Sequence, residues 1–112
     1  MKLLDGETIV APDMVVYEVA NAVWKHECLL KNLDDGKQYV AVLHGLIESG
    51  KIAVIPPNED LMQKSYQIAK RNELTIYDAV FVALAIQLDL PLKTLDGEQM
   101  RVFTFESNEK LQ

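Results

Sequence analysis

Short runs of apolar residues alternate along the chain with polar connections, and their spacing predicts strands that alternate with helices. Residues 7–11, followed by Pro12, have the composition of a short strand. Asp13 is then a candidate N-cap for a helix from Met14 to Leu30. In that segment apolar side chains recur near helical period, at Val15, Val16, Val19, Ala20, Val23 and Trp24.

The middle of the chain predicts two more helices with a strand between them. The first helix spans residues 37–49 and stops at Gly50, with a core face made of Val40, Leu43, Leu46 and Ile47. Residues 51–55 form the predicted strand, which Pro56 and Pro57 end. The second helix spans residues 59–71 with Asn58 as its cap, and its inward residues are Leu61, Met62, Ile68 and Ala69.

The next predicted helix has almost no polar face. Thr75 is a candidate cap, and the segment from Ile76 to Leu88 is apolar nearly all round, which predicts a buried helix. Pro91 to Thr94 predicts a short strand, and residues 95–99 predict a turn or a helical turn. Arg101 to Phe105 predicts a last strand, and the polar tail at residues 106–112 is expected to fray.

Strands alternating with helices predict an α/β fold with a mostly parallel central sheet. We expect residues 1–112 to form one domain, because this length suits a single hydrophobic core. In such sheets, ligands bind beyond the carboxyl ends of the strands. The order of elements therefore predicts where a functional site should lie.

Composition narrows the class of protein. Hydrophobic residues make up 49% of the chain and charged residues 25%, as in ordinary globular proteins. The single cysteine, the lack of an apolar run long enough to span a bilayer and the lack of a visible signal peptide predict a cytoplasmic protein. The formal net charge of -6 argues against a basic nucleic-acid binder, unless acidic residues gather around a divalent metal ion.

Three acidic residues lie where the predicted fold would place a site. Glu18 follows the first strand, Asp78 is in the first turn of the apolar helix, and Asp96 follows the strand that ends at Thr94. Carboxylates without a His or Cys partner suit Mg²⁺ or Mn²⁺ better than zinc. Each acid also has a structural explanation: Glu18 as a solvated helix residue, Asp78 as a favourable charge at a helix N-terminus and Asp96 as a turn residue.

Three segments resemble motifs of the PIN-domain ribonucleases, in particular the VapC-type toxins. Residues 16–23, VYEVANAV, are similar to the family's E-V-x-N-A helix. Residues 74–85, LTIYDAVFVALA, are similar to its L-x-x-Y-D-A-x-x-x-A-L-A helix. Residues 90–96, LPLKTLD, are similar to its L-P-L-x-T-x-D segment. The order and spacing of the three also agree, which makes the set far more specific than any one of them.

The resemblance implies a three-layer PIN-like fold and a Mg²⁺- or Mn²⁺-dependent endoribonuclease. Glu18, Asp78 and Asp96 match three of the four acids that hold the metal in that family. Thr94 matches a hydroxyl residue two positions before the last acid, and Asn21 matches a polar residue beside the glutamate. The implied partners are an RNA substrate, an antitoxin protein and a second copy of the chain in a homodimer, without a membrane.

The family also has a first strand, ending in the fourth acid, which we do not find in this sequence. Residues 1–5 resemble the end of the helix that follows that strand. We therefore expect slow RNA cleavage or none, and a catalytically inactive module for dimerisation or partner binding is the competing hypothesis. The gap would close if residues 8–11 paired with residues 92–94, or if another copy lent a segment.

Overall fold

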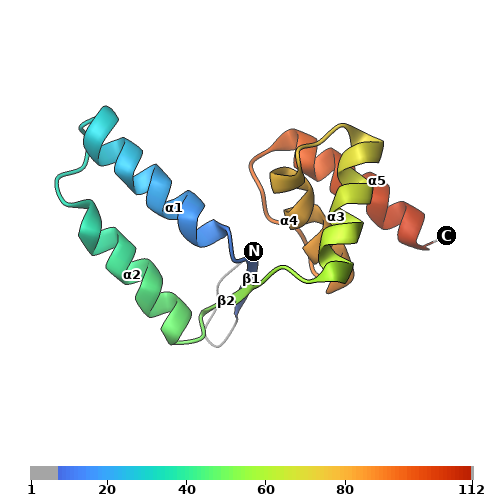
Figure 1. Cartoon of the computed structure of the whole chain (residues 1–112), viewed down its shortest axis with the longest axis horizontal. Coiled ribbons are helices and arrows are strands. Elements are labelled where there is room, and N and C mark those ends of the chain that lie inside the picture. Colours follow the sequence, from blue (N-terminus) through green and yellow to red (C-terminus); the bar gives the residue numbers. More distant parts are fainter. Residues whose placement is uncertain (1–7, 112) are drawn as a thin grey trace. The chain divides into compact units, whose positions relative to one another are not determined.

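The computed structural model describes residues 8–111, with side chains up to residue 109. Residues 1–5 and Glu7, to which two of the predictions refer, lie outside the described residues. The chain divides into two compact units, an N-terminal unit ending at Pro56 and a C-terminal unit beginning at Pro57. The elements along the sequence are β1 (Ile9–Pro12), α1 (Val15–Trp24), η1 (Lys25–Leu29), α2 (Gly36–Glu48), β2 (Ile52–Ile55), α3 (Glu59–Asn72), α4 (Ile76–Gln87) and α5 (Gly97–Leu111). Figure 1 labels all of them except η1.

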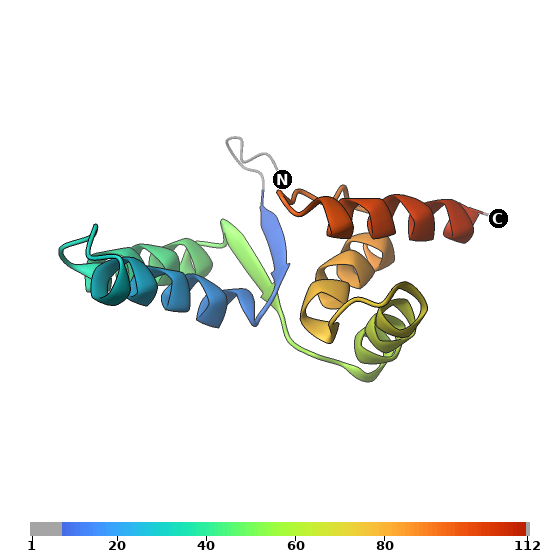
Figure 2. The same ribbon diagram turned by 90° about the horizontal axis from the view of Figure 1, so that it is seen from above.

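The N-terminal unit contains a parallel pair of strands joined by two helices. β1 and β2 pair in the register that sets Ile9 opposite Ile52 and Pro12 opposite Ile55. α1 and α2 form the connection and lie side by side in both views (Figures 1 and 2). The two strands were predicted to within two residues at each end. The predicted α/β fold with parallel strands is confirmed, although the sheet of the described residues has two strands only.

α1 begins without the side-chain cap that the sequence predicts. Met14 occupies the N-cap position and makes no capping hydrogen bond. The backbone N–H of Asp13 donates to the carbonyl of Ile55 at 2.9 Å, which keeps Asp13 at the end of the strand pair. The predicted extent of the helix, to about Leu30, is confirmed, but Lys25–Leu29 widens into a π-helical turn.

A short polar residue caps the N-terminus of α2, and a glycine follows its C-terminus. The carboxylate of Asp35 accepts a hydrogen bond from the N–H of Lys37 at 3.2 Å. Gly50, with a φ of +82°, follows the helix in the left-handed region, as predicted. Leu43 is buried and Leu46 and Ile47 are half-buried, but Val40 remains 41% exposed. Three of the four predicted core residues are therefore at least partly covered.

The C-terminal unit is a three-helix core in which α4 contacts both α3 and α5. The sequence correctly predicts the caps of α3 and α4, where Asn58 accepts from the N–H of Leu61 at 2.9 Å and Thr75 accepts from the N–H of Asp78 at 3.2 Å. α4 is buried along most of its length, as predicted. The prediction that Met62 turns inward is wrong: Met62 is 37% exposed, whereas Ser65 is fully buried and donates to the carbonyl of Leu61 at 2.7 Å.

Two predicted strands in the C-terminal unit are wrong. Residues 91–94 form no strand, and Arg101–Phe105 lies within the helix α5. Among the described residues the only paired strands are β1 and β2, and the pairing of residues 92–94 with residues 8–11 stays a prediction. The tail predicted to fray is helical as far as Leu111.

The contacts of α5 with the core of its unit explain why this segment is a helix. The buried residues Gln99, Val102 and Glu106 recur at spacings of three and four, which places them on one helical face. Glu106 is 3% exposed and accepts hydrogen bonds from Arg71 and Asn72 of α3. These contacts hold α5 against the core. None of the helices in the described part of the chain is long and apolar enough to cross a membrane.

Candidate functional site

Asp78 is fixed in the first turn of α4 by the cap of that helix. The side chain of Thr75 accepts from the backbone N–H of Asp78, which makes Asp78 the third residue of the helix. Its side chain is half-buried. A carboxylate there is stabilised by the partial positive charge of the helix N-terminus.

Asp96 is the cap of α5. Its Oδ1 accepts from the backbone N–H groups of Glu98 at 2.9 Å and Gln99 at 3.3 Å. The hydroxyl of Thr94 accepts from the backbone N–H of Asp96 at 3.0 Å. Thr94 therefore holds the backbone from which the Asp96 carboxylate projects.

Gln99 joins these residues, and the sequence interpretation missed it. Its Nε2 donates to the Oδ1 of Asp78 at 3.4 Å and to the backbone carbonyl of Asp78 at 3.2 Å. Its Oε1 lies 2.7 Å from the hydroxyl of Thr94. The D-x-x-Q pattern of residues 96–99 is a helix-start signature, so it could have identified both α5 and this glutamine.

Glu18 and Asn21 lie in the other unit. Both are exposed and stand three residues apart on α1, so they share one side of that helix. The structure thus brings Asp78, Thr94 and Asp96 together in the C-terminal unit, while the convergence of Glu18 and Asn21 with them stays a prediction. Within either unit, among the described residues, no three Asp, Glu, His or Cys side chains gather closely enough to hold a metal ion.

The carboxylates at the start of α5 and α4 have a donor chemistry that suits a hard cation. In this part of the described chain, Oδ1 of Asp78 and Oδ1 of Asp96 accept hydrogen bonds, and Oδ2 of each accepts none. Oxygen donors without imidazole or thiolate suit Mg²⁺ or Mn²⁺. Nearby, a hydrogen bond from Arg101 lowers the pKa of the exposed Glu98 carboxyl below its usual value, and the positive charge of Arg101 offsets that of Glu98.

An open hollow of about 440 Å³ adjoins Thr94. It is lined by Leu92, Lys93, Thr94, Leu95 and Met100, and apolar atoms predominate. Leu95 is fully exposed. The hollow is next to the Asp96 cap, and Lys93 contributes a positive charge at its edge.

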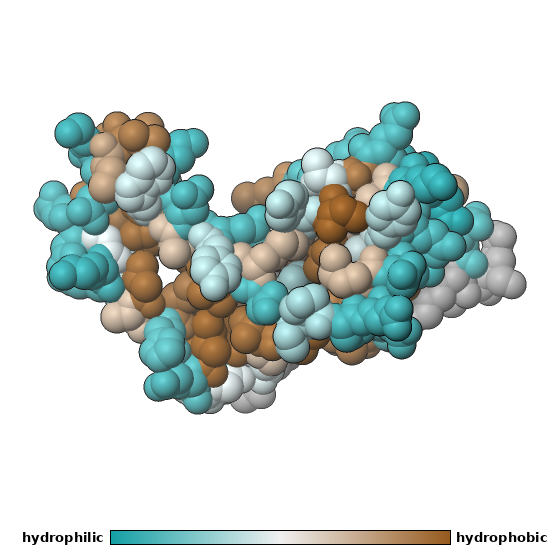
Figure 3. Space-filling model, viewed as in Figure 1, coloured by the Kyte–Doolittle hydropathy of each residue, from teal (hydrophilic) through white to brown (hydrophobic). Residues whose placement is uncertain are grey.

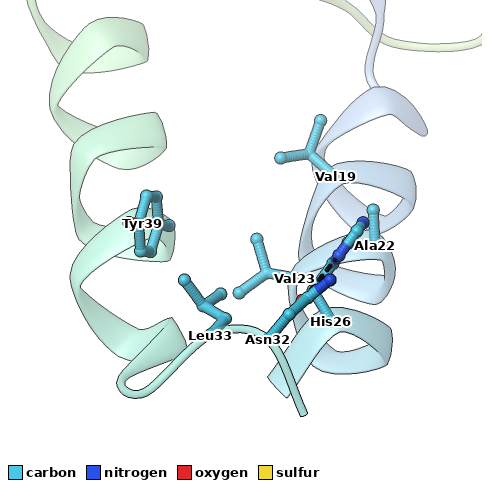
Figure 4. Close-up of a pocket in the computed structure, with 7 residues that line it drawn as sticks. All are labelled: Val19, Ala22, Val23, His26, Asn32, Leu33 and Tyr39. Atoms are coloured by element: carbon cyan, nitrogen blue, oxygen red, sulfur yellow. Dashed lines mark hydrogen bonds between the residues drawn. The ribbon is translucent and has the colours of Figure 1, made fainter. Parts of the chain in front are cut away.

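A second hollow, of about 430 Å³, lies between α1 and α2 in the N-terminal unit. Figure 4 shows its lining residues, which are Val19, Ala22, Val23, His26, Asn32, Leu33 and Tyr39. His26 and Asn32 are joined by a hydrogen bond of 3.0 Å between Nδ1 and Oδ1. Figure 3 shows apolar side chains at the surface of the two helices, and Trp24, Leu29 and Val42 are each more than half exposed, at 51%, 58% and 61%.

Comparison with known proteins places these residues in a family. The family model described as PIN domain matches residues 1–103, which include Glu18, Asp78 and Asp96. The chain belongs to the PIN-domain family. Among curated PIN-domain relatives, Ribonuclease VapC3 of Pyrobaculum aerophilum is 31% identical over 91 residues, which cover 81% of this chain and 68% of that protein. No solved structure matches the chain significantly.

Family membership confirms the resemblance drawn from the three sequence motifs. The matched region includes all three and runs through both compact units. The PIN-domain motif around Asp78 forms the capped start of α4, and the motif that ends at Asp96 forms the cap of α5. The family motifs therefore coincide with the elements that position both carboxylates.

Proposed function

We propose that this chain is a Mg²⁺- or Mn²⁺-dependent endoribonuclease, the toxin of a toxin–antitoxin pair, and that residues 1–112 act as one PIN domain. The similarity to Ribonuclease VapC3 over 81% of the chain is the observation that carries the proposal. The arrangement of Asp78 and Asp96 around Gln99 supports it, because two carboxylates with available oxygens lie at one end of the C-terminal unit.

In this proposal Glu18, Asp78 and Asp96 hold the metal ion. When bound, a divalent ion of this kind polarises the scissile phosphate and supplies a water of lowered pKa. Thr94 holds the Asp96 backbone through its 3.0 Å hydrogen bond, and Asn21 stands beside Glu18 on α1. The net charge of -6 would repel RNA in the absence of metal, so a cation at this site also makes substrate binding more favourable.

The proposed partners are an antitoxin protein and a second copy of the chain, in the cytoplasm. The apolar surface of the N-terminal unit supports a homodimer, since α1 buries none of its residues and Trp24, Leu29 and Leu30 are exposed. Exposed apolar patches of this kind mark interaction sites. Light scattering at micromolar concentration should give twice the chain mass, and a strictly monomeric protein would contradict this part of the proposal.

The experiment that tests the metal site is Mn²⁺ titration by calorimetry and thermal unfolding. A ligand that binds only the folded state raises the melting temperature, so Mn²⁺ should raise it for the wild-type chain. Asp78→Asn should abolish the shift. Asp60→Asn is the matched control, because Asp60 is likewise an acid in the first turn of a helix, and this exposed residue should leave the shift unchanged.

RNA cleavage is measured in parallel. We expect Mn²⁺-dependent cleavage of single-stranded RNA that EDTA and Asp78→Asn both remove, because the reaction needs the metal and Asp78 is a proposed ligand. A chain that forms the homodimer but neither binds Mn²⁺ nor cleaves RNA would refute the nuclease and favour an inactive module for partner binding.

A further inference from the structure

Gln99 contacts both carboxylates of the candidate site. Its backbone N–H donates to Oδ1 of Asp96 at 3.3 Å, and its side-chain Nε2 donates to Oδ1 of Asp78 at 3.4 Å. The residue is 7% exposed. A single buried residue thus binds an oxygen of each acid, and it leaves Oδ2 of each acid without a hydrogen bond among the described residues.

The orientation of the Gln99 amide follows from its neighbours. The hydroxyl of Thr94 already accepts the N–H of Asp96, so its own hydrogen is available for the Oε1 of Gln99, at 2.7 Å. With Oε1 occupied as an acceptor, the NH₂ group faces Asp78, where it meets both the carboxylate and the backbone carbonyl. Both Asp78 atoms that face the amide are acceptors, so only the NH₂ group can bind them, and a residue without a donor at position 99 would lose these hydrogen bonds.

Helix formation alone does not require this side chain. The N-terminus of α5 is capped by Asp96, and the contact of Gln99 with that cap uses only its backbone. Apolar Val102 fills the neighbouring buried position on the same face. A buried amide costs free energy unless it is hydrogen-bonded, so a long apolar side chain would serve packing equally well. The choice of glutamine is explained by the carboxylate that it binds.

We propose that Gln99 is a positioning residue that fixes the Asp78 and Asp96 carboxylates relative to each other and so sets the affinity of the site for a divalent cation. The inference rests on the proposed function. Removing a group that hydrogen-bonds a metal-binding carboxylate without touching the metal typically lowers metal affinity by about 10–100-fold.

The test compares Gln99→Met with wild type by Mn²⁺ titration calorimetry, at a temperature where both are folded. Met keeps the length and apolar stem of the side chain and removes its donor. We expect Mn²⁺ affinity to fall at least about tenfold. Gln67→Met is the matched control, since Gln67 is exposed on α3 of the same unit, and it should bind Mn²⁺ as wild type does.

A double-mutant cycle measured in EDTA tests the contact between Gln99 and Asp78 in the absence of metal. If Gln99 holds the Asp78 carboxylate, the melting-temperature shifts of Gln99→Met and Asp78→Ala should not add in the double variant. Thr94→Val and Thr94→Ser provide a second route if Gln99→Met does not fold. Val removes the hydrogen bonds of the hydroxyl to Gln99 and to the Asp96 N–H and should weaken Mn²⁺ binding, whereas Ser retains the hydroxyl and both hydrogen bonds and should bind Mn²⁺ more tightly than Val does.

The outcomes separate the inference from the function on which it rests. Unchanged Mn²⁺ affinity in Gln99→Met, or additive shifts in the cycle, would overturn the positioning role while the nuclease proposal stands. No Mn²⁺ binding by wild type would refute the proposed metal site. In that case the cycle in EDTA still decides whether Gln99 fixes the Asp78 side chain.

Discussion

Arg71 and Glu106 form the ion pair that joins α3 to α5, and removing the two partners should have unequal costs. The guanidinium of Arg71 donates from Nε at 3.0 Å and from Nη2 at 2.6 Å to the two oxygens of Glu106. Asn72 adds a third hydrogen bond at 2.8 Å. The two side chains differ in burial, because that of Arg71 is 46% exposed and that of Glu106 only 2%.

The difference in burial sets the magnitudes. In Glu106→Gln, Arg71 loses its counter-charge, but its half-exposed guanidinium can bind water instead. The free energy of unfolding should therefore fall only by the worth of ordinary hydrogen bonds and a half-exposed ion pair, about 1–2 kcal/mol. In Arg71→Met, the Glu106 carboxylate stays buried with Asn72 as its remaining partner. Breaking a buried pair costs about 3–5 kcal/mol, and the exposure of the arginine places this case near the lower end, at about 3 kcal/mol.

Urea unfolding followed by circular dichroism measures both losses. Lys70→Met is the matched control, because Lys70 is the exposed neighbour on α3 and its replacement should change the free energy of unfolding by no more than about 0.5 kcal/mol. The order of destabilisation should be Arg71→Met, then Glu106→Gln, then Lys70→Met. If Glu106→Gln were the more damaging change, or if Arg71→Met matched the control, the reasoning from burial would be refuted.

Two further predictions test local packing. Gly36→Ala should cost about 1–3 kcal/mol, since a Cβ there would lie 2.7 Å from Cγ1 of Val23 and 2.6 Å from Oε1 of Glu27, which accepts the Gly36 N–H. A Cβ at Gly45 has nothing within 4 Å, so Gly45→Ala should stabilise α2 by about 0.5–1 kcal/mol; equal effects in thermal unfolding would contradict this. Val102→Ala should lower the free energy of unfolding by about 2 kcal/mol, because Val102 is fully buried. Phe105→Ala should lower it much less, because Phe105 is 44% exposed. The reverse order would favour the strand that the sequence predicted for residues 101–105.

Local signals in the sequence predict most of the secondary structure. Asn58 and Thr75 are short polar residues directly before helical segments, and both cap as predicted. Gly50 ends α2 because glycine accepts the left-handed backbone at no steric cost. These features depend only on residues within one turn of each other, so no tertiary contact was needed to predict them.

Segments whose structure depends on distant partners were predicted less well. β-Branched and aromatic residues at 101–105 suit a strand. A strand needs a partner, however, and the buried pairing of Glu106 with Arg71 favours a helix. Ser65 is buried in place of Met62 because its hydroxyl bonds within its own helix, which removes the cost of burying it. Hydropathy alone cannot anticipate either case.

For the candidate site, too, one part could be predicted from the sequence and another part could not. The sequence by itself determined which carboxylates to consider, because Glu18, Asp78 and Asp96 stand in motifs whose order and spacing identify the PIN-domain family. Only the tertiary structure decided how Asp78 and Asp96 are joined, through the buried amide of Gln99. The physical reason is that residues 78 and 99 meet by the packing of α5 on α4, and such a contact leaves no periodic trace in the sequence.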